Sequence, residues 1–261
     1  MNITKDSNLK IGFPELRGSL AAVRYPAFVE PKYDGELNLW SSKYLVNKYG
    51  TVRKDTKLGL PPNMSLLGEL FYGEGKSGAL YELLKHKKDD SLSFIAFDML
   101  WLDGYGDIRN MPLVDRRELM FLKGVPFIIA AKVANSETEV MEIYQRYLDQ
   151  GMEGVVVKSL DSPFIEGPCS WVKLKHRDRN NLLVNKIDPT KERIEVLSPV
   201  PNGSNPNAIF NDGLGGWFVP VGLKVSNKDK ANLKEMDTVT VEHQGRLPSG
   251  SLRHPVYVKG G

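Results

Sequence analysis

A lysine followed by a tight turn is the first pattern in the chain that could carry covalent chemistry. Lys32 lies near the end of an expected strand, just before the Asp34-Gly35 turn. A lysine attacks as a nucleophile only as the neutral amine, which burial or neighbouring cations favour. Lys173 and Lys175 alternate on another expected strand, so they point to one face and could grip a phosphate. Ordinary solvated strands can carry the same lysines, so the pattern alone leaves both readings open.

Two glutamates and a phenylalanine occupy strand positions that could serve a nucleotide. Glu69 lies in Leu67-Gly68-Glu69-Leu70, and Glu153 precedes the apolar run that ends at Lys158. Carboxylate oxygens suit a ribose or a hydrated Mg²⁺, a hard cation that prefers oxygen ligands. Phe97 lies in an apolar strand, where an aromatic ring by default packs in the core. For each glutamate, the alternative is an ordinary surface acid.

A glycine-rich segment gives a competing nucleotide-binding reading. Residues 73–78 match G-x-G-x-x-G between an expected strand and helix, and Asp98 follows about twenty residues later, as in a dinucleotide site. The segment lies in mid-domain, however, and Glu74 would face a pyrophosphate. Gly75-Lys76-Ser77 also resembles the end of a Walker A loop, but Leu70 stands where that loop needs a glycine.

Ordered motifs over about residues 28–180 resemble the nucleotidyltransferase motifs of ATP-dependent DNA ligases. No single motif is specific, whereas the set in this order is. The motifs are Glu30-Pro31-Lys32-Tyr33-Asp34-Gly35, Leu67-Gly68-Glu69-Leu70, Phe94-Ile95-Ala96-Phe97-Asp98, Glu153-Gly154-Val155-Val156-Val157-Lys158 and Trp171-Val172-Lys173-Leu174-Lys175.

The resemblance implies a ligase that seals 3′-hydroxyl/5′-phosphate nicks in duplex DNA with ATP. Lys32 would attack the α-phosphate of ATP, expel pyrophosphate and hold AMP as a phosphoramidate. The AMP would pass to the 5′-phosphate at the nick, and the 3′-hydroxyl would then displace it. The family also implies nucleotide or Mg²⁺ contacts, with Glu69 and Glu153 as metal ligands, Phe97 on the adenine and Glu30 at its edge. The remaining contacts would come from Lys48, Arg53, Lys158, Lys173 and Lys175.

Three departures from the family pattern are visible. Leu37 stands where an arginine usually follows the lysine motif. The usual Ser-Arg-x-Gly reads Asn47-Lys48-Tyr49-Gly50, so Lys48 keeps the charge without the bidentate fork, and Arg53 could compensate. The sequence stops at Gly261, before the family's terminal Arg-x-Asp-Lys motif. These differences predict weakened self-adenylation unless another cation, such as Lys259, substitutes.

Several other functions share parts of this pattern. An RNA ligase or an mRNA capping guanylyltransferase has the same core, and a nucleic-acid-binding protein that has lost self-adenylation would fit the departures. The dehydrogenase reading of residues 73–78 predicts NAD(H) binding instead. NAD⁺-dependent DNA ligases are disfavoured, because they carry an extra domain before the lysine and a four-cysteine zinc module, whereas this chain has 31 residues before Lys32 and one cysteine.

The elements that must position these residues predict an α+β domain followed by an all-β domain. Periodicity predicts an α+β domain over residues 1–180. The resemblance implies that it is a nucleotidyltransferase domain of mostly antiparallel sheets with flanking helices. Residues 181–261 show short strands between Pro/Gly/Asn loops, as in a small barrel, and the resemblance implies an OB-fold. The expected helices span residues 77–88, 112–121 and 136–150. The expected strands span residues 28–33, 36–40, 44–48, 65–72, 92–102, 125–133, 154–159, 171–175, 182–187, 194–197, 217–223, 238–243 and 255–259.

Composition limits the remaining function classes. The chain has 261 residues with 41% hydrophobic content, a net charge of +3 and one cysteine, Cys169, which excludes a disulfide framework. No run of 18 apolar residues suggests a membrane span, and the N-terminal residues have no apolar signal core. We therefore expect a cytoplasmic monomer, nucleoid-associated if prokaryotic or viral.

Overall fold

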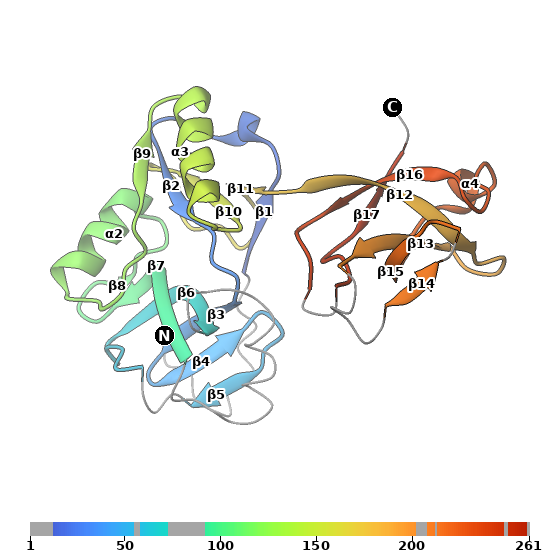
Figure 1. Ribbon diagram of the computed structural model, residues 1–261. Helices are drawn as coiled ribbons and strands as arrows, with labels where there is room; N and C mark the ends of the chain where they lie inside the picture. Colours follow the sequence, from blue (N-terminus) through green and yellow to red (C-terminus); the bar gives the residue numbers. More distant parts are fainter. Residues whose placement is uncertain are drawn as a thin grey trace. The chain divides into compact units, whose positions relative to one another are not determined.

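The computed structural model describes residues 13–54, 58–72, 92–201, 208–211, 213–247 and 250–259. The chain divides into two compact units, Met1–Leu174 and Lys175–Gly261 (Figure 1). The sequence-based boundary at Asn180 lies within a strand of the second unit. Within the described ranges, no helix is both long and apolar enough to span a membrane.

The first unit contains a five-stranded sheet that carries Lys32 at the end of its strand β2. The strand order is β1-β11-β10-β2-β9; β1 pairs with β11 in parallel, and β2 pairs with β10 and β9 antiparallel. The strands are β1 (Pro14–Arg17), β2 (Ala27–Pro31), β9 (Lys132–Ala134), β10 (Gly154–Ser159) and β11 (Gly167–Lys175), and a 3-10 turn, η1 (Leu20–Ala22), follows β1.

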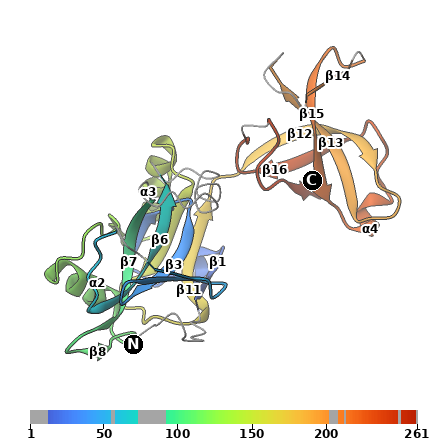
Figure 2. The same ribbon diagram turned by 90° about the horizontal axis from the view of Figure 1, so that it is seen from below.

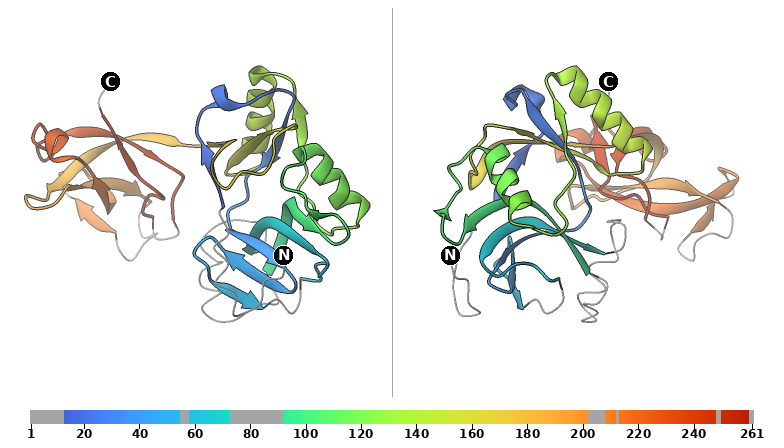
Figure 3. Two further views of the ribbon diagram at one scale, coloured as in Figure 1. Left: turned by 180° about the vertical axis from the view of Figure 1, so that it is seen from behind. Right: turned by 90° about the vertical axis from the view of Figure 1, so that its left-hand side faces the viewer.

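Helix α3 (Glu137–Asp149) covers this sheet, in contact with β2, β9 and β10 (Figure 3). Its start follows from the capping box: Ser136 Oγ accepts from the Glu139 amide at 3.2 Å. Val140 and Ile143 lie on one stripe of the helix and pack with alternate residues of β2 and β10 in a buried cluster. The helix therefore supports the strands that flank Lys32.

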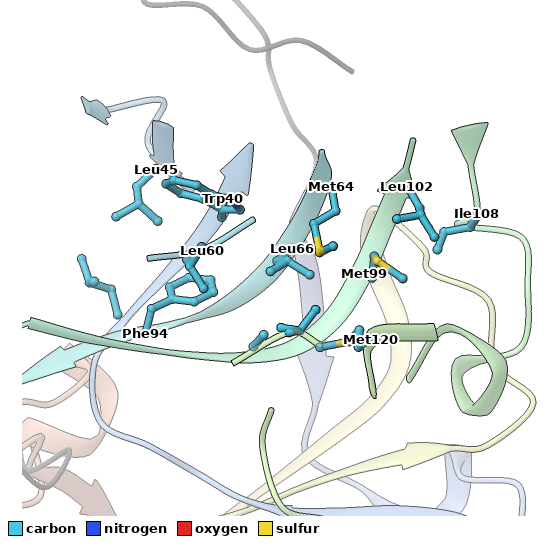
Figure 4. Close-up of a cluster of buried hydrophobic side chains, with 13 residues drawn as sticks. Trp40, Leu45, Leu60, Met64, Leu66, Phe94, Met99, Leu102, Ile108 and Met120 are labelled. Atoms are coloured by element: carbon cyan, nitrogen blue, oxygen red, sulfur yellow. The ribbon is translucent and has the colours of Figure 1, made fainter. Parts of the chain in front are cut away.

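A second, antiparallel sheet of the first unit carries Glu69 and Phe97. Its strand order is β5-β4-β3-β6-β7-β8. Helix α2 (Leu113–Leu122) packs on β7, and Figure 4 shows the apolar cluster under it, in which Trp40, Phe94 and Met120 are buried. The strands are β3 (Glu36–Ser41), β4 (Tyr44–Asn47), β5 (Val52–Lys54), β6 (Met64–Tyr72), β7 (Leu92–Leu102) and β8 (Gly106–Asp107).

The opposite face of this sheet packs against β11 of the first sheet. Leu39, Leu67 and Leu100 form a buried cluster there with Trp171 and the sole cysteine, Cys169. Because successive strand residues alternate between faces, Glu69 and Phe97 lie on this same face, in line with Leu67 and its neighbours. The two sheets therefore bring their site residues toward a shared apolar layer.

The second unit is an antiparallel sheet with strand order β14-β15-β13-β12-β16-β17 (Figure 2). Alternate residues such as Val184, Val196, Val221 and Val241 form its buried cluster. Its elements are β12 (Asp178–Ile187), β13 (Arg193–Val200), β14 (Ile209–Asn211), β15 (Gly216–Lys224), α4 (Asn227–Lys230), β16 (Thr238–His243) and β17 (Val256–Val258).

Mostly antiparallel sheets with few helices confirm the coarse fold prediction, but one expected strand is wrong over most of its length. Of residues 125–133, only the last two belong to a strand, β9. Pro126 has no amide to donate, and Phe127 has a positive φ of 57°, which no extended strand allows. The segment still meets β7, since the Ala96 amide donates to the Phe127 carbonyl at 2.9 Å. The glycine-rich segment 73–78 and the expected helix 77–88 lie outside the described residues.

Candidate functional site

Lys32 directly follows strand β2 of the first sheet, and its amine forms an ion pair with a carboxylate. Its backbone amide donates to the Gly154 carbonyl at 2.9 Å, which extends the β2–β10 pairing past Pro31. Its Nζ lies 2.8 Å from Glu153 Oε2 and 3.2 Å from the Tyr33 carbonyl. The two side chains are 20% and 9% exposed. Residues that are 121 positions apart thus form a largely buried ion pair.

The turn after Lys32 is docked on β6 beside Glu69. The Gly35 amide donates to Glu69 Oε1 at 3.1 Å. A Cβ atom at Gly35 would lie 2.2 Å from the Leu70 carbonyl oxygen, so only glycine allows the close approach of the two backbones. Burial raises the pKa of Glu69 to about 7, and the charge of Lys32 and the Gly35 hydrogen bond oppose that rise. The electrostatic coupling of Glu69 with both Lys32 and Glu153 places the three charges in one locality.

Glu30 and Lys158 form a buried charge cluster on the neighbouring part of the first sheet. Lys158 Nζ lies 2.6 Å from Glu30 Oε2, and both side chains are almost fully buried. Arg117 of α2 also bonds the Glu30 carboxylate and donates to the Ile129 carbonyl. Burial lowers the pKa of Lys158, while the adjacent Glu30 carboxylate acts against this. The Glu30 carboxylate is thus held by two cations from different elements.

Two aromatic rings complete this cluster. Lys158 Nζ lies 4.0 Å from the centroid of Phe97 and 4.2 Å from that of Trp171, which is cation–π geometry. The two rings meet edge to face with centroids 6.2 Å apart. Phe97 on β7 is therefore fixed in orientation by β10 and β11, the strands that carry Lys158 and Trp171.

The positions that depart from the family pattern lie on β3, β4 and β5. Leu37 packs against the apolar layer between the sheets and stands directly opposite Glu69. Arg53 Nη1 pairs with Glu36 Oε2 at 2.9 Å, and Asn47 Nδ2 also donates to Glu36. Lys48 is exposed, with its Nζ 5.0 Å from the Tyr49 ring centroid. Arg53 and Lys48 thus point to different partners, a carboxylate and an aromatic ring.

Lys173 and Lys175 occupy alternate positions near the end of β11, as the sequence predicts. Lys173 is exposed and Lys175 is half-buried. The division between the two compact units falls between them. Of the ten candidate residues, the hydrogen bonds and ion pairs directly link Lys32 with Glu153, Glu30 with Lys158, and Glu69 with the lysine turn.

Residues 67–175 match the family model of the ATP dependent DNA ligase domain. Over these residues the chain is similar to an ATP-dependent DNA ligase domain. The match includes Glu69, Phe97, Glu153 and Lys158, whereas Lys32 precedes it in the chain. Lys32 is therefore linked to this region by its sequence motif and by the contacts of the lysine turn, and not by the family match.

Curated relatives support the assignment of this domain. Identity is 31% over 97 residues with a probable DNA ligase of Dictyoglomus thermophilum, 37% over 102 residues with a DNA ligase of Methanoculleus marisnigri and 28% over 98 residues with the vaccinia virus DNA ligase. Each alignment covers 35% of this chain. The chain matches only 16–18% of the length of these relatives.

Solved structures resemble the fold over nearly the whole chain. A structure from work on Lig E DNA ligases matches with a TM-score of 0.74 at 16% identity and covers 96% of this chain and 99% of that one. The ligase domain of M. tuberculosis LigD matches with a TM-score of 0.55 at 18% identity and covers 97% and 95%. At these identities the likeness establishes a shared fold.

Four residues of the ligase domain site were not singled out from the sequence. Arg117 and Trp171 hold the Glu30–Lys158 cluster, and Glu36 and Asn47 hold Arg53 and the following turn. Trp171 opens one of the ligase-like motifs, which was a signal that could have been used. Asn47 likewise opens the Asn47-Lys48-Tyr49-Gly50 segment that departs from the family pattern. Arg117 and Glu36 carry no pattern of their own, because their partners are distant in sequence or lie on another strand.

Proposed function

We propose that the chain is an ATP-dependent DNA ligase that seals nicks through AMP bound covalently to Lys32. The observation that carries the proposal is the Lys32–Glu153 ion pair beside Glu69, in a chain whose residues 67–175 are similar to a DNA ligase domain. The relatives and the similar structures are DNA ligases, which supports DNA as the substrate. Nicked duplex DNA is the proposed partner, bound by a monomer.

The geometry supports the first chemical step. The Lys32 ammonium must lose a proton before it can attack, and the Glu153 carboxylate, 2.8 Å away, is positioned to accept it. The neutral amine then forms an N–P bond with the α-phosphate of ATP, and the bond to pyrophosphate breaks. The resulting phosphoramidate stores the activation until a 5′-phosphate takes the AMP.

The aromatic cluster supports adenine recognition. Phe97 offers a ring for stacking, and Lys158 and Trp171 fix its orientation. Glu30 is buried between Lys158 and Arg117, so in the proposed complex it stabilises the cluster of Phe97, Lys158 and Trp171. Lys48, Arg53, Lys173 and Lys175 are the proposed contacts for the nucleotide phosphates and ribose.

Two carboxylates fit the Mg²⁺ that such a reaction uses. Among the described residues no three potential ligands of His, Cys, Asp or Glu type cluster together. Mg²⁺ usually binds through one or two carboxylates and takes its other ligands from water and phosphates, so Glu69 and Glu153 suffice in type and number. The bound ion would supply charge stabilisation to the phosphates.

We also propose the domain identities that the sequence predicts, a nucleotidyltransferase domain over residues 1–180 and an OB-fold over residues 181–261. The second unit is wholly antiparallel, and β15 contacts β17 although three strands separate them in the sheet order. A sheet that curls until distant strands meet is typical of a small barrel. Such a barrel can contact the sugar–phosphate backbone of the nucleic acid, and these contacts do not depend on the base sequence, as nick sealing requires.

The proposal is tested by intact mass after incubation with ATP and Mg²⁺. Protein freed of bound nucleotide should gain one AMP mass. Lys32→Ala should gain none, while the exposed control Lys132→Ala should behave as wild type. Sealing of nicked DNA against nicked RNA, with ATP against GTP, separates a DNA ligase from an RNA ligase or a capping enzyme. No adduct, together with no sealing of a pre-adenylated nick, would overturn the proposal.

A further inference from the structure

Two aromatic side chains lie together at one edge of the second unit. Phe210 on β14 and Trp217 on β15 stand directly opposite each other, with ring centroids 5.4 Å apart and planes at 62°. Phe210 is 51% exposed, and neither ring belongs to the buried cluster of this unit. A large aromatic surface left in water costs free energy on its own, so its exposure points to a ligand.

Strand register places an arginine on the same face as these rings. Val219 shares a face with Trp217, and Ser198 stands opposite Val219, so Ser198 is a diagonal neighbour of Trp217. Diagonal neighbours in a sheet are roughly 7–8 Å apart. Arg246 Nη1 donates to Ser198 Oγ at 2.7 Å and to the Gly250 carbonyl at 3.2 Å. The guanidinium is therefore anchored beside the aromatic pair.

The anchored arginine retains donors for a ligand. Both contacts of Arg246 use Nη1, and its Nε and Nη2 have no partner among the described residues. The residue is exposed. A guanidinium held at one nitrogen presents its remaining N–H groups in a fixed direction, which suits bidentate binding of a phosphate.

We propose that Phe210, Trp217 and Arg246, the aromatic–arginine face, bind an unpaired nucleotide of a DNA strand. The base stacks on the Phe210–Trp217 pair, and the adjoining phosphate accepts hydrogen bonds from Arg246. Every base has a π-face, so the subsite does not read sequence. This inference rests on the proposed function and extends it to DNA whose bases are not all paired, such as gapped ends or overhangs.

An intact duplex cannot stack a base on the aromatic–arginine face. Stacked and paired bases hide their faces, whereas an unpaired base offers one side to an aromatic ring. The opposite side of β14 provides a matched control, because Ile209 is also exposed but alternates to the other face. The aromatic rings and a guanidinium that can donate hydrogen bonds to a phosphate together favour a nucleotide. An apolar peptide would leave Arg246 without a partner.

The test compares two labelled probes on the full chain without ATP, a single-stranded oligothymidylate and an abasic phosphodiester of the same length. Fluorescence anisotropy gives both affinities. Phe210→Leu, which keeps an apolar side chain but removes the ring, should weaken oligothymidylate binding about fivefold to a hundredfold and leave abasic binding unchanged. Arg246→Gln should weaken both probes. Ile209→Ala should change neither. Oligothymidylate, but not the abasic probe, should quench part of the tryptophan fluorescence of the chain, and Trp217→Phe should remove that quenching.

Equal affinities of wild type for the two probes, or an unchanged oligothymidylate affinity in Phe210→Leu, would overturn the inference. Each variant is first shown to unfold in urea at the same midpoint as wild type, so that a loss of binding is not a loss of fold. Base-dependent binding, with neither an AMP adduct on wild type nor sealing of a pre-adenylated nick, would instead overturn the proposed function and leave this subsite standing. An AMP adduct together with base-independent binding would support the proposed function and overturn the subsite.

Discussion

The carboxyl group of Glu69 lies in surroundings that favour its protonated form. Burial raises its pKa to about 7, and the nearby Lys32 ammonium opposes this only in part. Glu153, by contrast, bonds the ammonium directly at 2.8 Å. Two glutamates that the sequence presents as equivalent metal ligands therefore differ in their partners, which no motif encodes.

We expect the stability of the chain to report the titration of Glu69. Because its folded-state pKa of about 7 exceeds the ordinary value of 4.5, the folded chain binds more protons between these values. The free energy of unfolding therefore falls as pH rises through this window. Glu69→Gln keeps the acceptor for the Gly35 amide and should be more stable by about 2–3 kcal/mol at about pH 8, with no difference near pH 4. Urea unfolding in EDTA measures this, and equal curves at both pH values would contradict it.

Leu37 offers a second test at the same location. It stands directly opposite Glu69 on the neighbouring strand. A guanidinium there would favour the charged carboxylate, so Leu37→Arg should lower the pKa of Glu69 and move the stability loss to lower pH. Leu37→Met, which adds no charge, should leave the midpoint in place. The same unfolding series reads out both variants, and an unmoved midpoint in Leu37→Arg would refute the expectation.

Local sequence patterns singled out candidate residues but not their contacts. Lys32, Glu69 and Glu153 were singled out because each lies in a short motif, and the structure brings them to one locality. Arg117 was missed because the Glu30 that it binds lies 87 positions away in the chain. A side chain that acts through a distant partner leaves no periodic signal, so only the fold reveals it.

At the scale of elements, strands and helices with strong local signals were predicted closely. β7 and β10 have the expected bounds, and α3 begins one residue after its Ser136 cap. β14 lies between the strands expected over residues 194–197 and 217–223. The sequence predicts no strand there, because the three residues of β14 are too few to show alternation. Pairing with β15 decides its conformation, and that pairing depends on tertiary structure.

A buried ion pair joins two of these elements. Arg116 of α2 forms a bidentate contact with Asp98 of β7 at 2.7 Å, and both side chains are fully buried. Asp98→Ala leaves a buried guanidinium without its counter-charge and should lower the free energy of unfolding by about 3–5 kcal/mol. Arg24→Ala removes an exposed pair with Asp161, which solvent screens, and should cost far less stability. Chemical denaturation compares them, and similar losses in both would contradict the prediction.

At the scale of the whole molecule, the net charge of +3 is modest, so the proposed binding of DNA would depend on clustered cations. Such binding releases counterions, so the affinity for a nicked duplex should fall at least tenfold between about 50 and 200 mM salt. Anisotropy titrations at several salt concentrations give the slope. Arg246→Gln should make it shallower by about one unit. A flat affinity across this range would exclude backbone-directed binding.

The burial of Cys169 makes the chain ready for site-specific spectroscopy. The only thiol in the sequence lies in the apolar layer between two sheets, shielded from water-soluble reagents. A cysteine introduced at an exposed position, such as Phe121 in the first unit or Met236 in the second, would therefore react alone with a maleimide dye. With one cysteine in each unit, a donor and an acceptor dye would report the distance between the two units by energy transfer. This distance could be followed through each step of the proposed reaction.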